Sequence, residues 1–172
     1  SEKNQSECFN EFSKVLAKVK RKSKKQENVL VAKKDRKNHK VVVVMSDGEC
    51  DEGSNWEAIM FSGFHKLNHL IAIVDYNKYQ SLKSTYETLD LEPFRDKWES
   101  FNWEVYEVNG HEHNELLNVF NILSNNSSKP KVIIANTVKG KGVSFMEKKV
   151  LWHYRSAQGD ELKKGLEELM EN

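Results

Sequence analysis

Apolar residues follow two different periods along the chain, and these predict two kinds of secondary structure. Short runs rich in β-branched residues predict four strands, at about 40–46, 69–76, 103–108 and 131–136. Apolar residues at helical spacing predict four helices, at about 54–67, 91–100, 113–124 and 159–171. Strands that alternate with helices form parallel βαβ units. The sequence therefore predicts the α/β class, with a parallel β-sheet flanked by helices on both faces.

The first 28 residues form a different kind of segment. Apolar side chains at helical intervals predict an amphipathic helix there, with Phe9, Phe12, Val15, Leu16 and Val19 on one face. A Lys-rich stretch follows, which we interpret as a solvated face or tail because no nucleic-acid-binding motif accompanies it. Neither a repeat nor a low-complexity linker interrupts the rest of the chain, so residues 29–172 are predicted to form one domain.

Polar side chains stand at the ends of the first two predicted strands. Asp47, Gly48 and Glu49 follow the first strand, and Asn77 follows the second. The carboxyl ends of parallel strands meet at one edge of a sheet, where open α/β sheets bind ligands. Mg²⁺ prefers oxygen ligands and needs only one or two protein side chains when phosphate and water supply the others. Asp-Gly alone is common turn chemistry, but the ligand at a second strand end favours a site for metal-bound phosphate.

The helix that follows Asp47 is predicted to begin near Ser54. Ser54 and Glu57 have the spacing of a capping box, in which a hydroxyl and a carboxylate satisfy amide groups at the helix start. The free amides and the positive end of the helix dipole favour an anion nearby. The residues between Glu49 and Gly53 leave the distance from this helix to the anion open.

Length and charge narrow the possible classes of protein. The chain has 172 residues, enough for one domain with a sizeable core. Its net charge of +1 gives no general argument for binding to nucleic acid or to a membrane, although RNA binding by the basic first segment stays open as a minor alternative. Cys8 and Cys50 have no metal-ligand spacing, and no apolar stretch is as long as a membrane span. We therefore expect a soluble protein in the reducing cytoplasm.

Two longer strings around the strand ends resemble the thiamine diphosphate motif of transketolases. They are SDGECDEGSNWEA at 46–58 and LIAIVDYNKYQ at 70–80. Downstream, KGKGVSFME at 139–147 and WHYR at 152–155 look like the N-terminal subunit of split transketolases. The resemblance covers about 32–172. It implies a thiamine diphosphate-binding fold of the diphosphate-binding type, truncated at its N-terminus relative to similar proteins.

The same resemblance implies a site for thiamine diphosphate and Mg²⁺. Asp47 and Asn77 would ligate the metal through their side chains, and Tyr79 through its backbone carbonyl. Gly48 would contact the diphosphate, and Glu49 follows it in the same cofactor-binding motif.

Three further features of the resemblance have two interpretations each. Glu52 matches a residue at the dimer interface of the family that is linked to communication between paired sites, or it is an acid that favours the helix dipole. His153 matches a residue that faces cofactor and substrate, where it would hydrogen-bond phosphate or a developing oxyanion, or it packs beside its aromatic neighbours. Lys139 and Lys141 attract phosphate, or they belong to a solvated Gly-rich loop.

Two other clusters are interpreted as structural. His111-Glu112-His113 lacks a third ligand at metal spacing and opens an amphipathic helix, so we expect no zinc site there. An aromatic group has helical spacing that leads into a strand, which predicts core packing rather than a stacking surface. Its members are Phe94, Trp98, Phe101 and Trp103.

The resemblance implies a transketolase half-enzyme that moves a two-carbon ketol unit between sugar phosphates. In this family the Glu that protonates the aminopyrimidine lies in another domain, which split enzymes carry on a C-terminal, pyrimidine-binding subunit. We therefore expect activity only in a homo- or hetero-oligomer with that partner. The alternative is a truncated, non-catalytic remnant that keeps the fold as a binding module. A third interpretation is another thiamine diphosphate enzyme, such as a deoxyxylulose phosphate synthase or a 2-oxo acid dehydrogenase.

Overall fold

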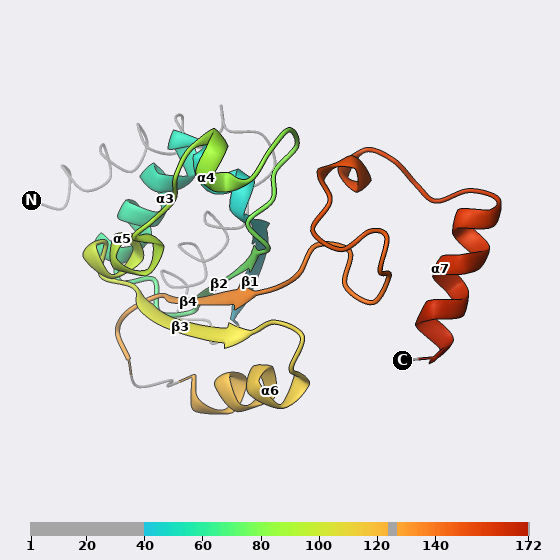
Figure 1. The fold of residues 1–172 in the computed structure, drawn as a ribbon. Coiled ribbons are helices and arrows are strands. Elements are labelled where there is room, and N and C mark those ends of the chain that lie inside the picture. Colours follow the sequence, from blue (N-terminus) through green and yellow to red (C-terminus); the bar gives the residue numbers. More distant parts are fainter. Residues whose placement is uncertain (1–39, 124–126, 172) are drawn as a thin grey trace, which may run out of the picture.

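Among the residues that the structure describes, four parallel strands form a central sheet (Figure 1). The computed structural model describes residues 40–123 and 127–171, so the helix predicted within the first 28 residues lies outside the described part. The strands are β1 (Val41–Ser46), β2 (Leu70–Tyr76), β3 (Glu104–Asn109) and β4 (Lys131–Asn136). Their order in the sheet is β1-β2-β4-β3, and every neighbouring pair is parallel. The predicted parallel α/β fold is confirmed.

Within 40–123 and 127–171, the longer helices lie close to their predicted positions, and three short helices were not predicted. The longer helices are α3 (Gly53–Phe64), α5 (Phe94–Ser100), α6 (His113–Ile122) and α7 (Asp160–Glu171). The short additions are η1 (Asp47–Asp51), α4 (Thr85–Thr88) and η2 (Val150–His153). A turn of five residues or fewer is too short to show a helical period, so the sequence pattern does not reveal it.

Helices cover both faces of the sheet, as Figure 1 shows. On one face, α3 and α5 contribute Ile59 and Trp98 to a core that includes Val74 and Ile134 of the strands. On the other face, α6 places Val119 against a second group of strand side chains. Three of the four predicted aromatic core residues are buried and the fourth packs against them: Trp98, Phe94, Trp103 and Phe101. The prediction of an aromatic core is confirmed.

Edge strand β1 and helix α7 expose more apolar surface than the centre of the sheet. Val42 and Val44 on β1 are 43% and 65% exposed. In Figure 1, α7 stands apart from the sheet beyond a long connection. Glu168 of α7 accepts hydrogen bonds from the backbone N–H and the hydroxyl of Ser144, at 2.5 and 2.8 Å. These bonds attach α7 to the loop that follows β4 rather than to the sheet.

The start of α3 corrects one prediction. Ser54 and Glu57 do not form a capping box, because α3 begins at Gly53 and its N-cap is Glu52, which makes no side-chain cap hydrogen bond. Ser54 therefore lies inside the first turn, where its hydroxyl is not at the capping position. A capping box is instead present one element earlier, at η1, where Ser46 and Glu49 exchange hydrogen bonds.

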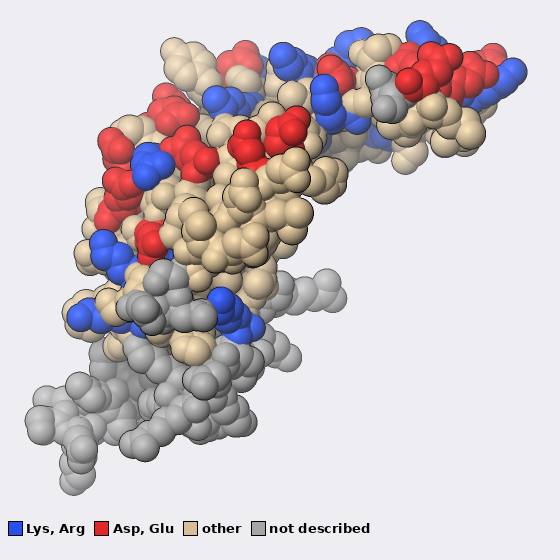
Figure 2. Space-filling view, turned by 90° about the horizontal axis from the view of Figure 1, so that it is seen from below, with Lys and Arg blue, Asp and Glu red and all other residues tan. Residues whose placement is uncertain are grey.

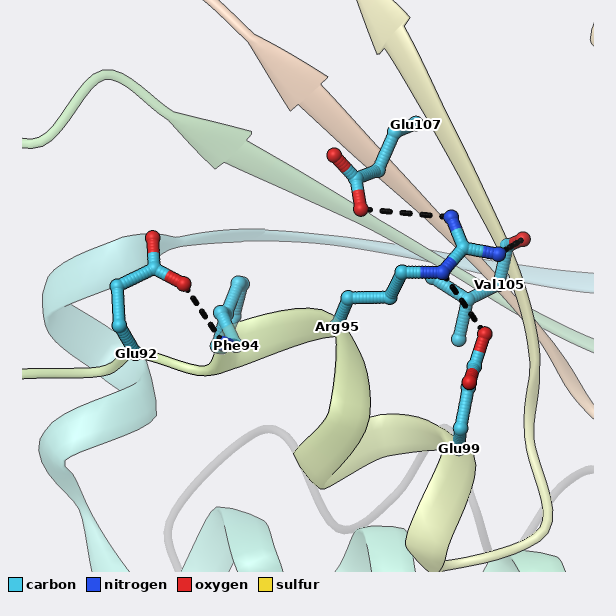
Figure 3. A network of polar contacts seen from close by, with 6 residues as sticks. All are labelled: Glu92, Phe94, Arg95, Glu99, Val105 and Glu107. Carbon is cyan, nitrogen blue, oxygen red and sulfur yellow. Dashed lines mark hydrogen bonds and ion pairs between the residues drawn. The ribbon is translucent and has the colours of Figure 1, made fainter.

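One ion pair and one hydrogen bond of Arg95 connect α5 to β3 at the surface. Arg95 of α5 donates to Glu99 at 2.8 Å, and its guanidinium reaches Glu107 and the carbonyl of Val105 on β3 (Figure 3). The side chains of the charged pairs are more than 40% exposed, so each pair contributes at most about 1 kcal/mol. On the face seen in Figure 2, acidic side chains lie beside basic ones, and a broad area carries neither. None of the helices in the described ranges is long and apolar enough to cross a bilayer.

We predict that Gly63→Ala destabilises the fold and that Gly53→Ala in the same helix does not. A Cβ at Gly63 would lie 1.7 Å from the carbonyl oxygen of Phe101, a backbone atom that cannot turn away. A Cβ at Gly53 would meet nothing within 4 Å. Urea unfolding should show a loss of about 2–3 kcal/mol for Gly63→Ala. Equal stability of the two variants would contradict the close packing of α3 on the segment before β3.

Candidate functional site

The carboxylate of Asp47 joins the ends of β1 and β2. Asp47 begins η1 directly after β1 and is only 1% exposed. Its Oδ1 accepts the backbone N–H of Gly48 at 2.7 Å. Its Oδ2 accepts the backbone N–H of Lys78 at 2.6 Å, and Lys78 is the residue directly after Asn77. The structure therefore brings the two predicted ligand segments into direct contact.

Burial disfavours the negative charge on this carboxylate. It raises the pKa of Asp47 to about 6, although the N–H groups of Lys78 and Gly48 act in the opposite direction. The nearby carboxylates of Asp75 and Asp51 contribute to the same rise in pKa. A cation at this position would relieve that cost, because it favours the ionised carboxylate.

Asn77 is oriented by its own turn and by β2. Its Oδ1 accepts the N–H of Tyr79 at 2.9 Å, and its Nδ2 donates to Asp75 at 3.4 Å. Asp75 in turn accepts a hydrogen bond from the hydroxyl of Thr137 after β4. Lys78 adopts φ 66°, a left-handed conformation that reverses the chain after Asn77. The turn thus presents the side chain of Asn77 and the backbone of Tyr79 at the same strand end.

The chemistry of these groups fits a hard cation. Each carboxylate oxygen of Asp47 and the amide oxygen of Asn77 uses one hydrogen bond and keeps lone-pair capacity for a metal. The described residues contain no group of three or more His, Cys, Asp or Glu side chains placed to hold a metal. Mg²⁺ does not need such a group when phosphate oxygens and water complete its shell.

Three other predicted site residues follow β1, namely Gly48, Glu49 and Glu52. Glu49 turns back on the strand end, where its carboxylate accepts the N–H of Ser46 at 2.8 Å. Glu52 is exposed at the start of α3. A Cβ at Gly48 would lie 3.4 Å from Gln80, which is ordinary contact. Space within the protein therefore does not require glycine at this position.

A third segment reaches the site from the end of β4. The Nδ1 of His153 lies 3.2 Å from the Nζ of Lys139, and its Nε2 lies 3.4 Å from the hydroxyl of Ser81. His153 and Lys139, which the sequence singled out separately, are thus neighbours beside the loop that follows Asn77. Lys141 points to a different partner, since its Nζ lies 3.8 Å from Glu147.

The glycines of the G-K-G loop are required by its backbone. Gly140 and Gly142 have φ of 73° and 91°, which side-chain-bearing residues rarely adopt. A Cβ at Gly140 would also lie 2.7 Å from the carbonyl oxygen of Met146. The loop conformation that places Lys139 beside His153 therefore depends on glycine.

A cavity of about 760 Å³ opens between the ends of β2 and β4. Asn77 and Tyr79 line it from one side, and Thr137 and Val138 line it from the other. His111 lies behind this second side, where its Nε2 accepts the N–H of Val138 at 2.7 Å. This hydrogen bond gives His111 a structural role at the end of β3.

Sequence reasoning missed the groups that hold the site together. The N–H of Lys78, the hydroxyl of Ser81 and the side chain of Gln80 all belong to the short loop after Asn77. Their only sequence signal is adjacency to a predicted ligand, because their partners lie far away along the chain.

The fold and the site define a parallel α/β domain with a buried carboxylate and a neighbouring amide oxygen at the carboxyl edge of its sheet. The family model described as transketolase, thiamine diphosphate binding domain, matches residues 13–169. The chain belongs to this family.

Curated relatives and solved structures agree with the family match. The chain is 38% identical over 142 residues to an apulose-4-phosphate transketolase subunit of Phocaeicola vulgatus, a match that covers 83% of this chain and 50% of that protein. It is 42% identical over 124 residues to 6-deoxy-6-sulfo-D-fructose transketolase subunit SqwG of Clostridium sp., a match that covers 72% of this chain and 45% of that protein. The transketolase structure from Campylobacter jejuni superposes with a TM-score of 0.72 at 28% identity, covering 78% of this chain and 21% of that one. The chain thus spans about half the length of these curated relatives.

We predict that Asp47 makes the metal-free protein less stable as the pH rises from about 4 to about 6. The folded state keeps a proton on this carboxyl up to about pH 6, whereas the unfolded chain releases it near pH 3.8. The contribution of Asp47 to the free energy of unfolding is therefore constant below pH 3.8 and above about 6, and it falls between these values. The total fall is on the order of 3 kcal/mol. Urea unfolding of wild type and of Asp47→Asn at several pH values measures this fall. The difference in free energy of unfolding between the two proteins should change with pH. A pH-independent difference would contradict the raised pKa.

Proposed function

We propose that this chain is the diphosphate-binding part of a transketolase of the split type. In this proposal Asp47 and Asn77 ligate Mg²⁺ through side-chain oxygens, Tyr79 adds its backbone carbonyl, and Gly48 and Glu49 flank the diphosphate. The observation that carries the proposal is the 2.6 Å hydrogen bond from the N–H of Lys78 to Asp47, which brings the segment of the second ligand to the first. Family membership supports the same cofactor.

Thiamine diphosphate, when bound, supplies an ylid and an electron sink. In this proposal the residues of the chain itself bind and orient the cofactor. His153 and Lys139 lie 3.2 Å apart beside the loop after Asn77, so both are placed to donate hydrogen bonds to phosphate or to an oxygen that gains negative charge. The half-buried turn of Asn77 and Tyr79 also lines the cavity between the ends of β2 and β4, whereas Asp47, Lys139 and His153 lie outside its lining.

The proposed reaction transfers a two-carbon ketol unit between sugar phosphates and needs a second polypeptide. The relatives from Phocaeicola vulgatus and Clostridium sp. described above are named as transketolase subunits. We propose that the partner is the C-terminal, pyrimidine-binding subunit, which supplies the acid for the aminopyrimidine, in a cytoplasmic oligomer. Glu52 is exposed at the start of α3, and we place it at the interface between subunits.

A binding module without turnover is the second candidate function. The two candidates share the cofactor site and differ in catalysis. Mixing the chain with the complementary polypeptide, a ketose phosphate donor and an aldose phosphate acceptor separates them. Ketol transfer supports the enzyme, whereas cofactor binding with no product supports the module.

We predict Mg²⁺-dependent binding of thiamine diphosphate that Asp47→Ala abolishes. Removing groups that only orient metal ligands costs about 10- to 100-fold in metal affinity, so loss of a direct ligand should cost more than about 100-fold. Isothermal titration calorimetry with and without Mg²⁺ measures this.

Asp96→Ala is the matched control, because Asp96 is an exposed aspartate in the first turn of α5. It should bind like wild type. The metal assignment fails if wild type binds equally well without Mg²⁺, or if the two alanine variants behave alike.

A further inference from the structure

A second hydrogen bond joins the two segments that carry the proposed metal ligands. Gln80 lies in the loop after Asn77, and its Nε2 donates to the Oδ2 of Asp51 at 2.7 Å. Asp51 is the last residue of η1, the short helix that Asp47 begins. The segments are thus fastened at two points, by Asp47 at one end of η1 and by Asp51 at the other.

Two attachment points fix an orientation that a single hydrogen bond leaves free. With the bond between Asp47 and Lys78 alone, the loop could still rotate about that contact. The side chain of Gln80 also passes close to Gly48, where a Cβ would lie 3.4 Å from its Cγ. Gln80 therefore spans η1 from its second residue to its last.

The loop is stiff enough to transmit this constraint to Asn77. The N–H of Gln80 donates to the carbonyl of Lys83 at 2.8 Å, and the N–H of Thr85 donates to the carbonyl of Lys78 at 3.0 Å. These two backbone bonds close the loop on itself. A displacement of the Gln80 side chain would consequently shift the turn that holds Asn77.

Asp51 depends on Gln80 for its side-chain hydrogen bonding. Among the described residues, its other oxygen, Oδ1, is buried and has no hydrogen-bond partner. Losing the bond from Gln80 to Oδ2 would leave both carboxylate oxygens of Asp51 without a hydrogen bond, which would reduce the stability of the fold. The next residue along the loop, Ser81, contacts His153, so two adjacent residues of the loop after β2 contact η1 and η2.

We propose that Gln80 is a positioning residue that sets the separation of the Asp47 and Asn77 oxygens through its bond to Asp51. It does not touch the metal in this proposal, and it controls how well the two ligands can share one ion. The inference rests on the proposed Mg²⁺ and diphosphate site.

The test uses calorimetry of the full chain with thiamine diphosphate, with and without Mg²⁺. Gln80→Met keeps the apolar stem and removes the amide donor. We expect the Kd measured with Mg²⁺ to rise about 10- to 100-fold, while the weak affinity measured without Mg²⁺ stays unchanged. Gln158→Met is the matched control, since Gln158 is an exposed glutamine in the connection before α7, and it should bind like wild type.

An exchanged pair separates positioning from general damage. Asp51→Asn combined with Gln80→Glu keeps the net charge and the hydrogen bond but reverses donor and acceptor. This double variant should regain most of the Mg²⁺-dependent affinity that Gln80→Met loses. A folded double variant that binds as weakly as Gln80→Met overturns the inference.

The outcomes distinguish the two proposals. If wild type shows no Mg²⁺-dependent affinity, the proposed function fails. If wild type binds and Gln80→Met binds equally well, only the positioning role fails. If the variants do not fold, as judged by circular dichroism, the side-chain amide NMR signal of Gln80 in wild type decides. It should shift when Mg²⁺ and thiamine diphosphate are added, and an unchanged signal overturns the inference.

Discussion

The contact between the Asp47 carboxylate and the backbone N–H of Lys78 is the interaction on which the site depends. It joins the ends of two neighbouring strands at 2.6 Å, in a position where the carboxylate is 1% exposed. Burial makes this charge costly, and the pKa of Asp47 rises to about 6 for that reason. A buried carboxylate with unused lone pairs at a strand end is energetically poor for a protein alone and well suited to holding a cation.

The rest of the site is arranged around that contact by short-range geometry. Lys78 has a left-handed backbone conformation between Asn77 and the loop residue Gln80, which bonds to Asp51. The glycines at 140 and 142 allow the loop after β4 to bring Lys139 to His153. All three segments begin at the carboxyl end of a strand, so the parallel sheet determines the edge at which they meet. The family match at 13–169 includes all three segments.

The two faces of the sheet differ in how completely the described helices cover them. The face under α3 and α5 holds a dense aromatic core around Trp98. On the other face, α6 packs against part of the sheet, and Val44 at its edge remains 65% exposed. The proposed site lies next to the better covered face, because η1 is followed by α3 after the single residue Glu52.

The sequence alone determined the strands, the main helices and the residue types at the strand ends, because hydrophobic period and turn chemistry are local properties. It also carried the family resemblance that the family match confirms. Only the tertiary structure decided that Asp47 bonds to Lys78, that Asp51 bonds to Gln80 and that His153 meets both Lys139 and Ser81. These partners are separated by long stretches of chain, and their pairing follows from strand order and loop conformation. The capping box shows the same limit: Ser54 and Glu57 have the required spacing, but α3 begins at Gly53, and the box forms at Ser46 and Glu49 instead.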